Sequence, residues 1–213
     1  MSATPRLRAD ALRLVAVTDS LSGGMDGLAR RAAAAVAGGA TMLTLRLPEE
    51  SARTLIEVAR SLREAAPGVP LLVSDRVDVA LAVNADGVHV GGRDLSAAVV
   101  RRFTPPSLII GASVGASEDL SRSEGADFVA IGPVFAASGA GGAGTTMGVA
   151  QFSELARLCG VPAIAVGGVA PENVGDLMAA GAVGVAVISA LLGADDPLSA
   201  ARALRAAVDA SGR

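Results

Sequence analysis

The sequence has 213 residues, of which 51% are hydrophobic and 18% charged, and its formal net charge is −3. This balance is typical of a globular protein and disfavours binding to nucleic acid or to an anionic membrane surface. All 18 basic residues are arginines, so the absence of lysine excludes Schiff-base enzymes and P-loop nucleotide hydrolases.

Read from the N-terminus, short apolar runs alternate with amphipathic segments. The runs cover 14–17, 42–45, 71–73, 87–90, 108–110, 128–131, 163–166 and 185–188. Their Val, Ile and Leu content is typical of strands buried on both faces of a parallel sheet. Helical spacing marks 26–38, 50–66, 76–84, 95–103, 117–124, 150–159, 171–180 and 197–209. Eight such units without a linker predict a single α/β domain over residues 1–213, a (β/α)8 TIM barrel.

Residues 136–147 depart from this regular series because they are small, uncharged and rich in glycine. They fall between the sixth predicted strand and the next helix, on the side where barrel enzymes place their sites. A surface loop and a lid over the site are both compatible with this composition.

The sequence predicts a protein of the cytoplasm. It has one cysteine, Cys159, which excludes an internal disulfide and suits a reducing compartment. The residues at the N-terminus have no apolar core of a signal peptide, and no stretch reaches the length of a membrane span. We expect no membrane partner and leave a homo-oligomer open.

Polar residues follow the predicted strands, where a β/α barrel carries its chemistry. In strand order they are Thr18-Asp19, Arg46, Ser74-Asp75, His89 to Asp94, Ser113, Gly132-Pro133, Gly167-Gly168 and Ser189. Arg46 is the natural partner for an anion there. His89 lies inside a strand pattern, where a hydrogen-bonded core histidine and a substrate contact are both open.

Glycines after the seventh strand and a hydroxyl after the eighth have the layout of a barrel phosphate site. Gly167 and Gly168 would allow a close backbone approach to an anion, and Ile188 and Ser189 would open the next helix toward it. The alternative is a tight turn followed by an ordinary helix cap.

Asp75 and Asp94 follow neighbouring strands and are candidates for a shared Mg²⁺ site. Mg²⁺ commonly takes one or two carboxylates and completes its shell with water and phosphate oxygens. Each aspartate also stands where a helix N-cap would stand, so a purely structural role is the alternative.

Seven stretches of the sequence resemble thiamine-phosphate synthases and the related thiazole tautomerases. They are LVAVTD at 14–19, LR at 45–46, SDRVDVALA at 74–82, ADGVHVGGRDL at 85–95, GADFVAIGPVF at 125–135, AVGGV at 165–169 and GVAVIS at 184–189. Together they extend over nearly the whole chain. The resemblance implies a β/α barrel that condenses hydroxymethylpyrimidine diphosphate with a thiazole phosphate to give thiamine phosphate and pyrophosphate.

The resemblance also implies roles for individual residues. Asp75 and Asp94 align with the aspartates that hold Mg²⁺ on the diphosphate. Gly168, Ile188 and Ser189 align with the thiazole phosphate site. Arg46 and Ser113 align with groups that contact the pyrimidine or the diphosphate, and we assign them as catalytic; Ser74, Gly167, His89 and Arg93 complete the predicted substrate contacts.

The chain departs from the family pattern at two lysines. The usual Gln-Leu-Arg-Glu-Lys run reads Thr44-Leu45-Arg46-Leu47-Pro48, and the lysine-bearing lid motif falls in 136–147, which has no cation. Ser74 replaces the family's asparagine, and Arg93 is expected to take over part of the missing charge. The characteristic tautomerase histidine would fall near Gly115-Ala116 and is absent. A slow synthase is therefore predicted; a tautomerase-like isomerase and a non-catalytic binder of thiamine-precursor phosphates are the alternatives.

Overall fold

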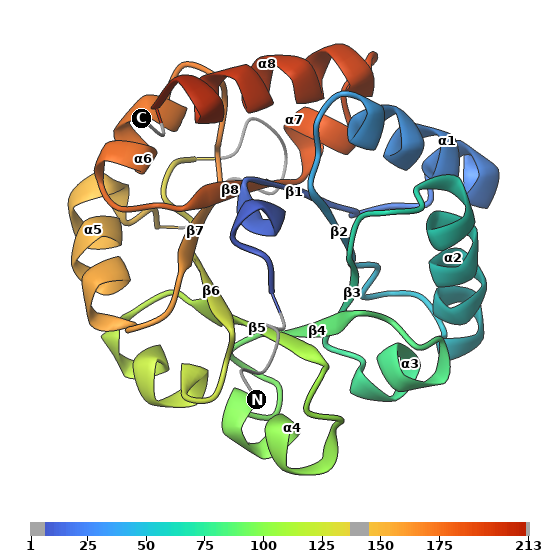
Figure 1. Ribbon diagram of the computed structural model, residues 1–213, viewed down its shortest axis with the longest axis horizontal. Helices are drawn as coiled ribbons and strands as arrows, with labels where there is room; N and C mark the ends of the chain where they lie inside the picture. The colour runs from blue at the N-terminus through green and yellow to red at the C-terminus, as the bar shows by residue number, and fades with distance from the viewer. Residues whose placement is uncertain (1–6, 137–144, 212–213) are drawn as a thin grey trace.

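The protein is a closed barrel of eight parallel strands, each hydrogen-bonded to its neighbours in sequence and β8 to β1 (Figure 1). The computed structural model describes residues 7–136 and 145–211. The strands are β1 (Leu14–Val17), β2 (Met42–Leu45), β3 (Leu71–Ser74), β4 (Gly87–Val90), β5 (Ile109–Val114), β6 (Phe128–Ile131), β7 (Ala163–Val166) and β8 (Gly184–Val187). The predicted (β/α)8 TIM barrel is confirmed.

Helices form a ring around the barrel (Figure 1). The α-helices are α1 (Gly24–Ala37), α2 (Ala52–Ala65), α3 (Val77–Ala82), α4 (Ala97–Phe103), α5 (Gly148–Leu158), α6 (Val174–Ala179), α7 (Ser189–Leu192) and α8 (Pro197–Ser211), and the 3-10 helices are η1 (Ala9–Leu12) and η2 (Ser117–Ser123). In α2 the Ser51 side chain accepts a hydrogen bond from the Thr54 amide, and Leu55, Val58 and Leu62 are buried. A polar cap and one apolar face therefore fix this helix on the sheet.

No helix in the described ranges is long and apolar enough to cross a membrane.

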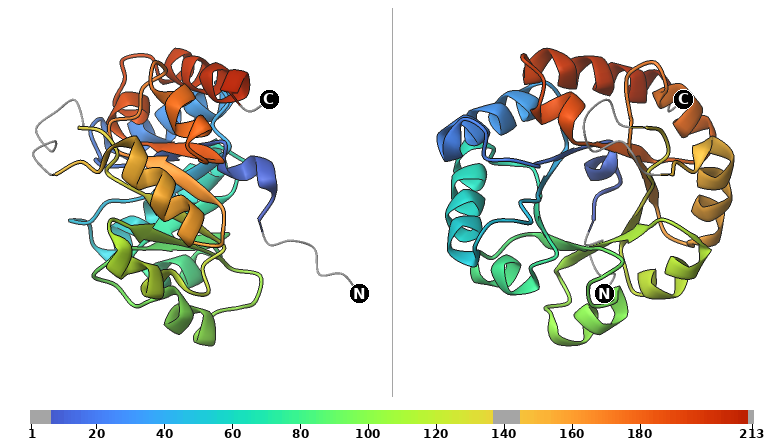
Figure 2. Two further views of the ribbon diagram at one scale, coloured as in Figure 1. Left: turned by 90° about the vertical axis from the view of Figure 1, so that its left-hand side faces the viewer. Right: turned by 180° about the vertical axis from the view of Figure 1, so that it is seen from behind.

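The barrel interior is a packed core that η1 closes at one end. Leu12 of η1 belongs to the same cluster of buried residues as Met42, Ile109 and Phe128 from the strands. Figures 1 and 2 show η1 lying across the mouth of the barrel. A Cβ atom on Gly184 would lie 1.9 Å from the carbonyl oxygen of Leu12, so this contact requires glycine. The candidate site lies at the opposite end of the barrel, at the carboxyl ends of the strands.

The structure corrects several predicted boundaries. Strand β5 begins one residue later than predicted and extends to Val114, so Ser113 lies inside the strand and not after it. The segment predicted as a helix after β5 is the 3-10 helix η2, and the short helices η1 and α7 were not predicted. Of the predicted lid, residues 137–144 lie outside the described residues.

Candidate active site

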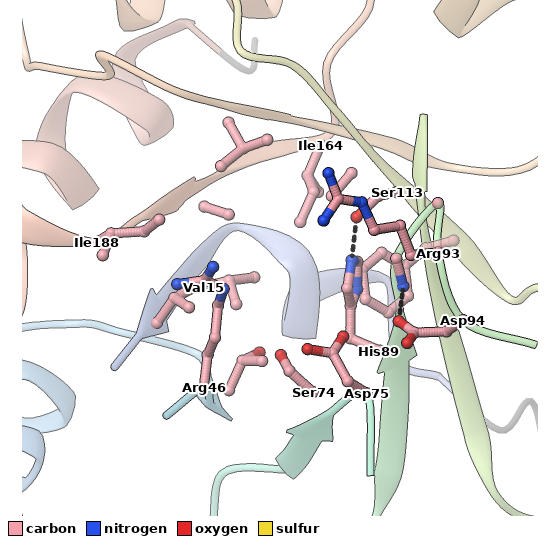
Figure 3. A pocket seen from close by; sticks show the side chains of 18 residues that line it. Val15, Arg46, Ser74, Asp75, His89, Arg93, Asp94, Ser113, Ile164 and Ile188 are labelled. Atoms are coloured by element: carbon pink, nitrogen blue, oxygen red, sulfur yellow. Dashed lines mark hydrogen bonds between the residues drawn. The ribbon is translucent and has the colours of Figure 1, made fainter. Parts of the chain in front are cut away.

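A cavity of about 520 Å³ opens at the carboxyl ends of the strands (Figure 3). This volume is within the range of small-molecule sites. Apolar side chains from the strands form one part of its wall. Polar side chains that lie on or shortly after β2 to β5 form the other part. The lining residues are Val15, Val17, Thr44, Arg46, Ser74, Asp75, His89, Gly91, Gly92, Arg93, Asp94, Ser113, Phe128, Ala130, Ile164, Val166, Ala186 and Ile188.

Asp75 and Asp94 approach each other at this cavity, as predicted from their positions after neighbouring strands (Figure 3). Burial and the adjacent Asp94 carboxylate raise the pKa of Asp75 to about 6, and Arg46 opposes the rise. Asp75 also has a φ of 67°, which is uncommon for a residue other than glycine. Its amide donates to the carbonyl of His89 at 2.8 Å, so the turn is held by the next strand. Strain and mutual repulsion at a cavity are features of functional carboxylates.

Neither aspartate caps a helix, so the structural alternative drawn from the sequence is wrong. The residue before α3 is Arg76 and the residue before α4 is Ser96. Instead, Asp94 closes its own loop: its Oδ2 accepts a hydrogen bond from the Gly91 amide at 2.7 Å. Both carboxylates are therefore left facing the cavity.

Arg46 is held by a residue whose role the sequence did not reveal. The fully buried Thr18 accepts a hydrogen bond from the Arg46 amide at 2.8 Å and donates to the Arg46 carbonyl at 3.1 Å. The threonine hydroxyl therefore fixes the backbone from which the guanidinium extends. In Figure 3 the Arg46 guanidinium lies across the cavity from Arg93. The polar position of Thr18 at the end of β1 was the signal available from the sequence.

His89 and Ser113 form a hydrogen-bonded pair in the cavity wall. The Nε2 atom of His89 lies 2.9 Å from the Ser113 Oγ, and the histidine ring packs against Phe128 at 5.9 Å between centroids. Burial lowers the pKa of His89 to about 4, with Asp94 acting in the opposite direction. The imidazole is therefore neutral near pH 7. The hydrogen bond to Ser113 agrees with the reading of His89 as a hydrogen-bonded histidine of the strand, and a contact between His89 and substrate stays a prediction.

Arg93 is an exposed arginine on the loop after β4, next to Asp94. Figure 3 shows its side chain extending over Ser113 toward the cavity. It forms no ion pair with the described residues. Ser74, the last residue of β3 and the neighbour of Asp75, also lines the cavity. Arg46 and Arg93 therefore bring two cationic groups to the cavity that also holds the carboxylate pair.

The predicted phosphate site borders this cavity. Ile188 lines the cavity and precedes α7, whose first residue is Ser189. Gly167 and Gly168 have φ angles of 95° and 61°, and a Cβ atom at Gly168 would lie 2.5 Å from the Ala136 carbonyl oxygen. The segment after β6 packs closely against Gly168, which explains why this position needs glycine. Phosphate binding at these residues stays a prediction.

The carboxylate pair fits a divalent cation only in part. No group of three or more His, Cys, Asp or Glu side chains is arranged to hold a metal ion within residues 7–136 and 145–211. Two hard carboxylate donors match Mg²⁺, which is usually bound by one or two carboxylates together with substrate phosphates and water. The residues present therefore suit a Mg²⁺ ion that arrives with a phosphate-bearing ligand.

Comparison with known proteins decides the family. The model of the thiamine monophosphate synthase family matches residues 14–191. The chain belongs to the thiamine monophosphate synthase family. It is 41% identical to the thiamine-phosphate synthase of Moorella thermoacetica, over 91% of this chain and 94% of that protein. It is 45% identical to the thiamine-phosphate synthase of Laribacter hongkongensis, over 87% of this chain and 90% of that protein.

A solved structure supports the same assignment. The thiamine phosphate pyrophosphorylase from Pyrococcus furiosus superposes with a TM-score of 0.84 at 33% identity, covering 95% of this chain and 98% of that one. The match to the thiamine monophosphate synthase family runs from β1 into α7, so every predicted site residue lies within it. The family resemblance read from the sequence motifs is confirmed.

Proposed function

We propose that this chain joins hydroxymethylpyrimidine diphosphate to a thiazole phosphate, releasing pyrophosphate and forming thiamine phosphate. The observation that carries the proposal is the pair of carboxylates, Asp75 and Asp94, facing a cavity that also holds Arg46 and Arg93. Family membership supplies the reaction, and this site supplies groups that suit a diphosphate leaving group.

The reaction exchanges one bond for another without net proton transfer. The C–O bond between the pyrimidine methylene and the diphosphate breaks, and pyrophosphate leaves with the electron pair. The ring nitrogen of the thiazole phosphate then forms a C–N bond to the methylene carbon. Such a mechanism needs charge neutralisation of the leaving group and protection of the electron-poor carbon from water.

Asp75 and Asp94 would hold Mg²⁺ together with diphosphate oxygens. When bound, the ion supplies positive charge that stabilises the leaving pyrophosphate. Arg46 and Arg93, from opposite sides, would bind the remaining diphosphate oxygens, and guanidinium groups suit such contacts because they donate two parallel hydrogen bonds. Arg46 stands where the family pattern has its own arginine, and Arg93 would take over part of the charge of the two family lysines that the chain lacks.

The other cavity walls suit the organic part of the substrate. Phe128, Ile164 and Ile188 would exclude water from the reacting carbon. The hydroxyl of Ser113, oriented by neutral His89, would donate to or accept from the pyrimidine ring, and Ser74 would contact the same substrate. The thiazole phosphate would lie against Gly167, Gly168, Ile188 and Ser189, where backbone amides can meet its oxygens.

We place this reaction in the cytoplasm. A single cysteine, half-buried Cys159, agrees with a reducing compartment because no internal disulfide is possible. Both proposed substrates are small, soluble phosphate esters.

The test combines the purified protein with both substrates, with Mg²⁺ or with a chelator. Pyrophosphate and thiamine phosphate should appear in equal amounts and only with Mg²⁺. Asp94→Asn should reduce the rate by at least about 100-fold, since it removes one charged partner of the leaving group. Asp78→Asn, on the outer face of α3 and away from the cavity, is the matched control and should turn over normally.

Two other results would select the alternatives. Substrate binding by calorimetry without any pyrophosphate release, even at high Mg²⁺, would identify a non-catalytic binder of thiamine-precursor phosphates. Metal-independent isomerisation of a thiazole phosphate would identify a tautomerase-type enzyme. Either result contradicts the synthase proposal.

A further inference from the structure

Arg122 is a partly buried arginine outside the reaction described above. It lies in η2, the 3-10 helix after β5, and its Nη2 donates a hydrogen bond to the backbone carbonyl of Asp94. Its Nε is buried without a hydrogen-bond partner among the described residues. No described carboxylate forms an ion pair with it. A buried N–H group without a hydrogen-bond partner is costly, so this placement calls for an explanation.

The partner of Arg122 is the loop that carries Asp94. Two hydrogen bonds within the loop link Gly91 and Asp94: the Gly91 amide donates to the Asp94 carboxylate, and the Asp94 amide donates to the Gly91 carbonyl at 3.2 Å. Gly92 and Arg93 between them are exposed. Apart from the contact between the Asp94 and Asp75 carboxyl groups, the bond from Arg122 is the one hydrogen bond that joins the described residues 92–94 to another segment of the chain.

Asp75 is fixed differently, because it follows β3 directly. Its amide donates to the carbonyl of His89 on β4 at 2.8 Å, which ties it to the barrel. The separation of the two carboxylates therefore depends on where the Asp94 loop stands relative to the barrel. Arg122 anchors that loop to η2, which itself packs against β5.

We propose that Arg122 is a positioning residue for the Asp75–Asp94 metal site: by holding the Asp94 carbonyl it keeps the Asp94 carboxylate in place for the cation. This rests on the proposed function. Arg122 is absent from the cavity lining, so it acts through the main chain of Asp94 and not on the ligand. Loss of such outer contacts typically weakens metal binding by about 10–100-fold.

The test measures metal binding itself. Mn²⁺ is titrated into the full chain in the presence of inorganic pyrophosphate, followed by electron paramagnetic resonance of the free ion and by calorimetry. Arg122→Gln should raise the Mn²⁺ dissociation constant by about tenfold or more. Arg122→Lys keeps a charged donor on a shorter side chain. Its Mn²⁺ dissociation constant should lie between the values for Arg122→Gln and the native protein.

Arg101 provides a matched control at the other end of the barrel. It is also a partly buried arginine that donates to a backbone carbonyl, that of Leu108 at 2.6 Å, and it forms an ion pair with Asp127 at 2.6 Å. Arg101→Gln should lower the melting temperature and leave the Mn²⁺ dissociation constant unchanged. This separates a general loss of stability from a specific effect on the metal site.

The outcomes distinguish this inference from the proposed function. If the native protein does not bind Mn²⁺ with pyrophosphate, both fail. If the native protein binds Mn²⁺, and Arg122→Gln binds the ion as tightly as the native protein or as tightly as Arg101→Gln, only the role of Arg122 is overturned. If Arg122→Gln does not fold, Arg122→Lys decides, and a dissociation constant within about twofold of the native value overturns the proposal.

Discussion

Replacing Asp75 with asparagine should stabilise the metal-free fold while removing a carboxylate that the reaction needs. The pKa of Asp75 is raised from 3.8 to about 6, first by burial and then by Asp94. A pKa difference of one corresponds to about 1.4 kcal/mol, so the ionised carboxylate destabilises the native state by at most about 3 kcal/mol. Water in the open cavity screens this effect, and we expect about 1–2 kcal/mol. Asparagine tolerates the φ of 67° at this position, so the substitution adds no strain.

The sign of the effect depends on pH. Because the native pKa lies above the unfolded one, the penalty is absent below about pH 4, grows between about pH 4 and 6, and is complete near pH 7. The free energy of unfolding of Asp75→Asn should therefore equal that of the native protein near pH 4 and exceed it near pH 7.5. For a chain of this size the gain corresponds to about 2–8 °C in melting temperature.

The assay is urea and thermal unfolding of both proteins at pH 4 and pH 7.5 in a chelating buffer. Asp78→Asn serves as control, because the exposed ion pair with Arg76 lowers the pKa of Asp78 and its loss should cost slight stability at pH 7.5. A gain for Asp75→Asn that is equal at both pH values would show that charge is not its cause. A loss of stability at pH 7.5 would refute the reasoning outright.

Three further substitutions test the support and the charge of the site. Thr18→Val removes both hydrogen bonds to the Arg46 backbone and should cost about 1–3 kcal/mol in urea unfolding, with a higher KM for the pyrimidine diphosphate; an unchanged KM would show that Arg46 needs no such anchor. Gly111→Ala places a Cβ 2.5 Å from Phe128 Cζ and 2.6 Å from His89 Nδ1 and should destabilise by about 1–3 kcal/mol, whereas full stability would mean that both rings move freely. Pro48→Lys adds a cation beside Asp75 in a cavity of about 110 Å³ and should speed pyrophosphate release, measured at saturating substrates, by about tenfold; a slower or equal rate would argue against a deficit of charge.

The sequence by itself determined the barrel and the location of its chemistry. Short apolar runs separated by amphipathic segments are sufficient to predict parallel strands, because such strands are buried on both faces and are rich in Val, Ile and Leu. Polar residues at the strand ends then indicated one edge of the barrel. The positions of Asp75 and Asp94 after neighbouring strands also indicated that they would meet.

Only the tertiary structure decided how that edge is built. Ser113 lies within β5 and not after it, because Gly111 and Ala112, which carry little strand signal, pair with both β4 and β6. The bond between Thr18 and Arg46 spans 28 residues, and the bond from Arg122 to the Asp94 carbonyl spans another 28. No local pattern predicts these pairings, because closing the barrel is what brings the ends of separate strands and their loops within hydrogen-bond distance.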